Sequence, residues 1–126
     1  MSNLVAVRLV GTTIADGTVT VTSEGAYSGL LHMVQWIDGD LTDGVDAVLS
    51  VTRNDAGVDN TLLTLTNANS DAVYFPRYIV HSEAGAALTG TSGGDRCMHP
   101  VLGKLQLAIT SGGDAHTGGC IVILEC

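Results

Sequence analysis

The stretch AYSGLLHMVQWIDGDLTDGVDAVLSV, residues 26–51, decides the fold that the sequence predicts. It contains the only Trp of the chain and its densest cluster of acids. We interpret it as a central β-hairpin with strands at 30–37 and 45–52, because the Asp-Gly pairs between them readily adopt the positive φ of a tight turn. Side chains alternate along a strand, so one face of the first strand holds Leu31, Met33, Gln35 and Ile37, and the other holds Leu30, His32, Val34 and Trp36. Both faces are therefore largely apolar.

Six further segments are predicted to be strands, mostly because apolar and polar residues alternate in them. They are 4–10, 18–22, 61–66, 72–81, 103–110 and 119–125. The same alternation predicts which side chains face inward, namely Val5, Val7, Leu9, Val19, Val21, Val45, Ala47, Leu49, Val51, Leu105, Leu107 and Ile109. With the two strands of residues 26–51, the chain has eight predicted strands.

Two segments in the second half depart from regular alternation. Pro76 cannot donate a hydrogen bond to a neighbouring strand, so 72–81 is predicted to be an edge strand or a bent strand. Residues 82–100 show little periodicity and contain four Gly. Long loops of this kind usually serve function or interaction, so 82–100 is predicted to be an interaction loop.

Length and composition indicate one all-β domain over residues 1–126. A chain of 126 residues can bury most of its surface without disulfides or metals. Sixteen Gly and many Thr, Ser, Asn and Asp, against five Lys plus Arg, are typical of short strands joined by tight turns. The uneven connections favour a β-sandwich or jelly roll with Greek-key crossings. An up-and-down barrel is the second choice.

Charge and hydropathy exclude two kinds of partner. The formal net charge is −8 and the few Lys and Arg are scattered, whereas nucleic-acid binding needs clustered positive charge. No apolar run approaches the roughly 20 residues that span a bilayer. The first residues, MSNLVAVRLVG, lack the basic region and long apolar core of a secretory signal. We therefore expect a protein made and kept in a cytosol, without nucleic-acid or membrane partners.

The sequence offers no recognisable catalytic or cofactor signature. It has no G-x-S-x-G elbow, no phosphate-binding G-x-x-x-x-G-K-[ST] loop and no G-x-G-x-x-G fingerprint. Its four His are spread singly, without zinc-site spacing. Cys97, Cys120 and Cys126 form an odd set, for which we expect reduced thiols, with a disulfide between subunits as the alternative. The expectation is a protein that is not an enzyme and needs no cofactor.

Four carboxylates within nine residues form a weak candidate for a calcium site. They are Asp38, Asp40, Asp43 and Asp46. Calcium prefers oxygen ligands of this kind, but an EF-hand needs Gly at position 6 and Glu at position 12, where this chain has Asp43 and Leu49. A solvated acidic turn is the alternative interpretation. The same acids could be taken for a glycosidase pair, although nothing in the sequence marks a sugar cleft.

Several segments together resemble small structural proteins encoded among the virion genes of tailed bacteriophages. They are QWIDGDLTDGVDAVLSV, TLLTLTNANSDAVYFPRYIVH, GAALTGTSGGDR and KLQLAITSGGDAHTGGCIVILE. The resemblance implies a capsid decoration or cement protein with a β-sandwich or jelly-roll fold, commonly a trimer. It implies the major capsid protein as partner, synthesis in the host cytoplasm and a final place on the capsid surface. Head-tail connector or tail proteins are alternatives within the same resemblance.

The interface is expected on the face of 30–37 that a sandwich core leaves uncovered. Leu30, Val34 and Trp36 are the candidates on that face. The alternative is that Trp36 and its neighbours are core residues beneath the loop. Arg96, in the predicted interaction loop, is the candidate for pairing with an acidic partner. The competing class is a lectin-like carbohydrate-binding module, which shares the architecture but would bind glycans with calcium.

Overall fold

Ten β-strands form the regular structure in the part of the chain that the computed structural model describes, residues 3–52, 59–79 and 96–126. Their bounds are β1 Leu4–Thr12, β2 Val19–Thr22, β3 Tyr27–Ile37, β4 Asp46–Thr52, β5 Asp59–Leu65, β6 Ala72–Tyr74, β7 Arg77–Ile79, β8 Arg96–Met98, β9 Pro100–Thr110 and β10 Thr117–Glu125. Eight strands join in one antiparallel sheet, and β7 pairs only with β8. In these residues no helix is long and apolar enough to cross a membrane.

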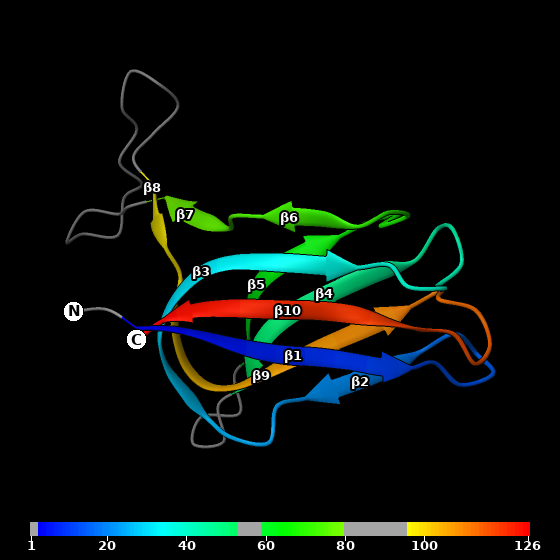
Figure 1. Cartoon of the computed structure of the whole chain (residues 1–126), viewed down its shortest axis with the longest axis horizontal. Coiled ribbons are helices and arrows are strands. Elements are labelled where there is room, and N and C mark those ends of the chain that lie inside the picture. The colour runs from blue at the N-terminus through cyan, green and yellow to red at the C-terminus, as the bar shows by residue number, and fades with distance from the viewer. Residues whose placement is uncertain (1–2, 53–58, 80–95) are drawn as a thin grey trace.

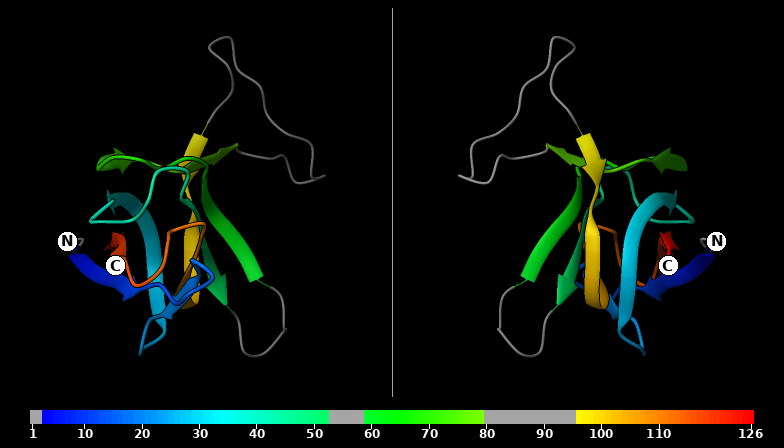
Figure 2. Two further views of the ribbon diagram at one scale, coloured as in Figure 1. Left: turned by 90° about the vertical axis from the view of Figure 1, so that its right-hand side faces the viewer. Right: turned by 90° about the vertical axis from the view of Figure 1, so that its left-hand side faces the viewer.

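The eight-stranded sheet folds over into two facing layers. The first sheet has the order β1-β10-β3-β6, and the second has the order β2-β9-β4-β5. The first sheet faces the viewer in Figure 1, and Figure 2 shows the two layers edge-on. The first residues of β3 pair with those of β9, Leu30 opposite Pro100, and this pairing joins the layers at one corner.

The strands pair in a nested order, the first with the last. β1 pairs with β10, β2 with β9, β3 with β6 and β4 with β5. A long hairpin that rolls up on itself produces this pattern, which is the double-sheet jelly roll. The predicted fold class, an all-β sandwich of jelly-roll type with about eight strands, is confirmed.

Most of the predicted inward faces are confirmed. Val7, Leu9, Val45, Ala47, Leu49, Val51, Leu105, Leu107 and Ile109 are buried, and Val5, Val19 and Val21 pack partly buried against them. These strands alternate without interruption, so one side of each enters the space between the sheets. The sequence pattern therefore predicts the core wherever the strand keeps a regular pleat.

The predicted central hairpin at 26–51 is wrong. β3 and β4 lie in different sheets and do not pair with each other. β3 takes β10 and β6 as neighbours, and β4 takes β5 and β9. The Asp-Gly pairs do make turns, with Gly39 and Gly44 at positive φ. Residues 38–45 nevertheless cross from one sheet to the other, because the apolar faces of the two strands pack face to face.

The predicted faces of β3 are also wrong, because β3 contains a β-bulge. Leu31 lies opposite Leu124 and Met33 lies opposite Ile123, so His32 is an extra residue without a partner in β10. An extra residue reverses the alternation from that point onward. Leu31 points inward, and beyond the bulge the inward residues are Val34 and Trp36.

The predicted strand 72–81 divides at Pro76 into β6 and β7. β6 is an edge strand of the first sheet, as the proline predicted. The predicted loop 82–100 falls mainly on residues 80–95, which lie outside the described part of the chain. Its last residues were assigned wrongly, because they form β8 and the start of β9.

The connections at one end of the sandwich hold one another through backbone hydrogen bonds. The amide of Asp40 donates to Thr117 O over 3.2 Å, and that of Thr42 donates to Gly112 O over 3.1 Å. Gly39 has φ of 58°, and a Cβ at this position would overlap the carbonyl oxygen of Thr117. The crossing from β3 to β4 therefore needs glycine here, both for its φ and for its lack of a side chain.

Replacing Gly39 tests this close approach. Gly39→Ala is expected to lower the free energy of unfolding by about 1–3 kcal/mol, because Ala at positive φ is strained and its methyl group displaces residue 117. Gly25→Ala is the matched control, since a Cβ there meets nothing within 4 Å, and we expect a change within about 0.5 kcal/mol. Urea unfolding measures both. Equal stabilities for the two variants would contradict the packing of the crossing.

Candidate functional site

Val34 and Trp36, two of the predicted interface residues, lie in the core. Each is only 1% exposed, and Trp36 Nε1 donates a hydrogen bond to Ala68 O over 3.1 Å. The prediction that they form an uncovered face is therefore wrong, and the reason is the β-bulge in β3. Leu30 lies before the bulge and is 40% exposed, as a surface role requires. Arg96 begins β8, but its side chain is outside the part that the structure describes.

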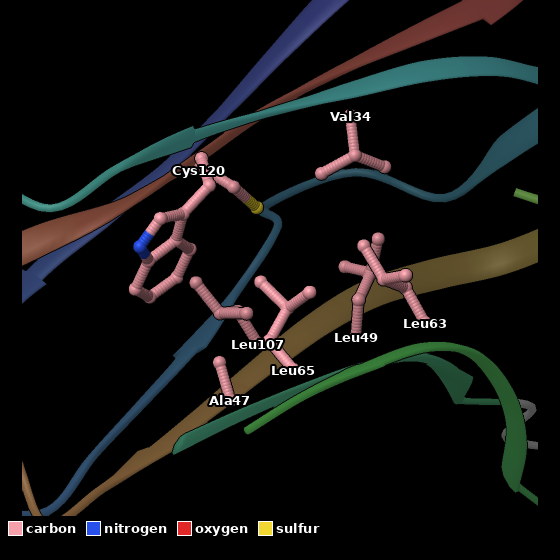
Figure 3. A pocket seen from close by; sticks show the side chains of 8 residues that line it. Val34, Ala47, Leu49, Leu63, Leu65, Leu107 and Cys120 are labelled. Carbon is pink, nitrogen blue, oxygen red and sulfur yellow. The ribbon is translucent and has the colours of Figure 1, made fainter. Parts of the chain in front are cut away.

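The core around these residues is closely packed. Figure 3 shows Val34 and Cys120 from the first sheet facing leucine and alanine side chains of the second. The cavity that they enclose has a volume of about 10 Å³, at the lower limit of the volume that holds one water molecule. This interior space is therefore too small for a ligand.

The outward side chains of the first sheet form a mostly apolar surface, which we call the outer face. Its members are Leu4, Ala6, Arg8, Val10 and Thr12 of β1, Thr117, Ile121, Ile123 and Glu125 of β10, Leu30, Met33, Gln35 and Ile37 of β3, and Val73 of β6. Val73 is 48% exposed, and Phe75, which follows β6, is 58% exposed. In Figure 1 this face is turned toward the viewer. An apolar surface of this extent is typical of an interaction site.

The second sheet provides an internal comparison, because its outward side chains are mostly polar. They are Thr20, Thr22, Asp46, Val48, Ser50, Thr52, Thr61, Thr64, Lys104, Gln106, Ala108 and Thr110. Only Val48 and Ala108 among them are apolar. One sheet of the same sandwich is thus suited to water and the other is suited to a partner.

The outer face carries two charges of opposite sign, Arg8 and Glu125. Register partners place Leu4, Glu125 and Leu30 in one row across the sheet and place Arg8, Ile121 and Gln35 in another row. The whole chain has a formal charge of −8, whereas these two charges cancel. The outer face is therefore neutral on a strongly acidic protein.

Arg77 stabilises the bulge that shapes the outer face. Its Nη1 donates to His32 O over 3.2 Å and to Pro76 O over 2.7 Å. Next to it, the amide of Leu31 donates to His99 O over 2.8 Å. Burial and then the charge of Arg77 lower the pKa of His99, which favours the neutral imidazole. The carbonyl group that the bulge leaves without a strand partner thus receives a charged donor.

Two of the candidate calcium ligands, Asp40 and Asp46, serve the backbone instead. Asp40 accepts a hydrogen bond from the amide of Thr117, and its other oxygen lies 3.3 Å from Nδ1 of His116. These contacts lower the pKa of Asp40, the amide of Thr117 most and the His116 side chain next. Asp46 Oδ1 accepts from the amide of Asn67 over 3.0 Å. Asp40 thus links the β3–β4 connection to the start of β10, and Asp46 links the start of β4 to the β5–β6 connection.

Asp38 and Asp43 do not join Asp40 and Asp46 in one site. The amide of Asp38 donates a hydrogen bond to the carboxylate of Asp71 over 2.8 Å. Burial, then the charges of Asp43 and Asp71, raise the pKa of the Asp38 carboxyl. Within residues 3–52, 59–79 and 96–126, no three or more His, Cys, Asp or Glu are grouped to hold a metal ion. The contacts described for these carboxylates are therefore separate, and a calcium site at the acidic turn stays untested.

The two cysteines with described side chains differ in environment. Cys120 is buried, and burial raises its thiol pKa to about 12, so this thiol is unreactive at neutral pH. Cys126 is exposed, and neither forms a disulfide within the chain. The side chain of Cys97 lies outside the described residues. A disulfide between subunits stays a prediction.

Comparison with known proteins gives one structural neighbour. No protein-family model and no curated protein match the sequence. A chain in the structure of infectious bursal disease virus, Gx strain, superposes with a TM-score of 0.35 and 11% sequence identity. The match covers 99% of this chain and 41% of the viral chain, so this chain spans less than half of its neighbour. A likeness at this level does not establish a shared function.

The contacts of Asp40 predict a pH dependence of stability. Its lowered pKa means that the folded chain favours the ionised carboxylate, so this stabilisation is complete above the unfolded value of about 4 and is lost as pH falls through the lower folded value. Asp40→Asn lacks the ionisable group. We expect its melting temperature to lie below that of the parent chain at pH 7 and the difference to shrink at pH 3.

Asp43→Asn is the control for this titration, because none of the hydrogen bonds described for the β9–β10 connection involves Asp43. We expect its melting temperature to follow that of the parent chain between pH 3 and pH 7. A difference for Asp40→Asn that stays constant over this range would contradict the role of its charge. A rise in melting temperature on adding calcium, absent in both variants, would restore the calcium hypothesis.

Proposed function

We propose that the chain is a non-enzymatic structural protein of a tailed-bacteriophage virion, bound as a homo-oligomer to the outside of the capsid, where it stabilises the head. The proposed partners are the major capsid protein and further copies of the chain. The observation that carries the proposal is the contrast between the apolar outer face and the polar second sheet. A protein with one such face gains stability by covering it, since apolar area removed from water contributes about 25 cal/mol per Å².

Three further features support this function. The segments quoted from the sequence resemble virion proteins of tailed phages, and the jelly roll is a frequent architecture of viral shells, although lectins share it. The strong negative charge suits a place outside the shell, because packaged DNA would repel an acidic protein. The sequence also lacks the nucleophile and cofactor motifs of the large enzyme classes. Together these features favour a structural protein that binds a partner over an enzyme.

The two-sided character of the sandwich suggests how such a part would work. The nested pairing gives each layer a pleated surface of four hydrogen-bonded strands. The outer face then supplies attachment without rearrangement, since its side chains stand on regular strands. The threonine-rich second sheet stays in water and keeps the assembled surface soluble. The resemblance is the reason to propose a phage virion, and the outer face is the surface proposed to bind to it.

Charges placed on the outer face test the proposal. The double substitution Met33→Asp with Ile123→Asp puts two carboxylates on neighbouring strands, because these residues are register partners. We expect it to reduce the number of copies per particle at least tenfold, since burying unpaired charges is costly. Quantitative mass spectrometry of purified particles provides the count, and labelling locates the chain on the head.

Val48→Asp with Ala108→Asp is the matched control, because Val48 and Ala108 are register partners on the second sheet. This variant should load onto heads as the parent chain does. Thermal unfolding of both variants verifies that they fold. Finding the chain only in tails or inside the head would contradict the proposed place on the outside of the capsid. Calcium-dependent glycan binding without any association with particles would favour the lectin-like class instead.

A further inference from the structure

The positions of Arg8 and Glu125 on the outer face indicate which molecule first covers it. The row of Glu125 and the row of Arg8 lie four residues apart along the strands, about 13 Å at the usual rise. Midway between them lies the row of Ala6, Ile123 and Met33. The face thus has an apolar centre, with a positive charge on one side and a negative charge on the other.

A two-fold axis makes such a face complementary to itself. In a two-fold contact the same patch is used by both copies, so each residue pair occurs twice. An axis that runs across the strands, over the middle row, exchanges the two charged rows. Arg8 then lies over the partner's Leu4, one strand away from the partner's Glu125. Neighbouring strands are about 4.8 Å apart, a distance that the long guanidinium side chain can bridge.

We infer that the outer face binds a second copy of this chain about this axis, with Arg8 of each copy paired to the partner's Glu125. The inference rests on the proposed function and names the occupant of the face in the free protein. The capsid protein and the second copy would use the same face, so the dimer must open before this face attaches to the capsid. The middle row, Ala6, Ile123 and Met33, packs against the same row of the partner at the centre of the contact. One ion pair lies on each side of it. This contact is two-fold and therefore differs from the trimer that the resemblance implies.

Two other arrangements, a two-fold axis parallel to the strands and a cyclic trimer, leave the charges unpaired. An axis parallel to the strands places the row of Arg8 opposite itself, and Glu125 likewise, so no opposite charges meet. A cyclic trimer joins two different patches, and the polar second sheet offers the outer face no apolar counterpart. Charges buried without a partner are costly. Neutrality also matters, because two copies of a chain with charge −8 repel each other over most other surfaces.

The size of the face sets the expected affinity. Four strands span about 19 Å and seven residues of each strand span about 23 Å, so the flat area is about 400 Å² on each copy. Together the copies cover about 800 Å², well below the roughly 1,200 Å² at which stable interfaces begin. The dimer should therefore dissociate on dilution in the micromolar range. Higher salt should weaken it, because the two ion pairs lie at the rim of the contact.

A charge exchange between two variants tests the inference in solution. Arg8→Glu places like charges opposite each other twice in its own dimer, and so does Glu125→Arg. Sedimentation velocity should show each variant alone to be at least tenfold weaker in dimerisation than the parent chain. An equimolar mixture should recover the dimer. In the mixed pair, the new carboxylate at position 8 meets the new guanidinium at position 125, while the other contact keeps Arg8 with Glu125.

Lys104→Glu and Asp114→Arg are the controls, because they make the same changes of charge away from the outer face. Both should dimerise as the parent chain does. A parent chain that is monomeric at about 100 μM, a trimer, or a dimer that neither single variant weakens would overturn the inference. These outcomes are separate from the particle test. A monomer that still loads onto heads would refute the pairing alone, and a dimer absent from particles would refute the proposed function alone.

Discussion

The β-bulge in β3 determines which side chains fill the core and which form the outer face. Without the extra residue at His32, the alternation from Leu31 onward would place Met33 inside and Trp36 outside. With it, Trp36 fills the centre of the sandwich and Met33 reaches the surface beside Ile123. The bulge is fixed by Arg77, whose guanidinium binds His32 O. One irregular position in one strand therefore sets the chemistry of an entire sheet surface.

The sequence predicts the class of fold and the faces of regular strands well, because alternation is a local property. β1, β4 and β9 bury the residues that their patterns indicate. The bulge in β3 was missed, since Leu, His, Met and Val in succession show no sign of where the alternation reverses. The hairpin predicted at 26–51 is wrong for another reason. Asp-Gly pairs specify that the chain turns, but pairing partners depend on strands up to a hundred residues away.

The candidate site shows the same division between local and distant information. An uncovered apolar face on β3 was predictable, because a sandwich buries only one side of each strand. Its membership was not, since the neighbours β1, β10 and β6 are known only from register. Arg8 and Glu125 lie more than a hundred residues apart in the chain. The four acids between 38 and 46 are close in sequence, which suggested one site. In the structure, Asp40 and Asp46 accept separate backbone hydrogen bonds.

The nested pairing of strands has a consequence for synthesis on the ribosome. β1 finds its partner only when β10 has emerged, because Leu4 pairs with Glu125. At translation rates of about 5–20 residues per second, this leaves the strands of the first sheet incomplete for several seconds or more. Pairing of such distant segments is also intrinsically slow. The nascent chain therefore presents its apolar strands to chaperones and to neighbouring nascent chains, and this hazard grows with the number of copies made at once.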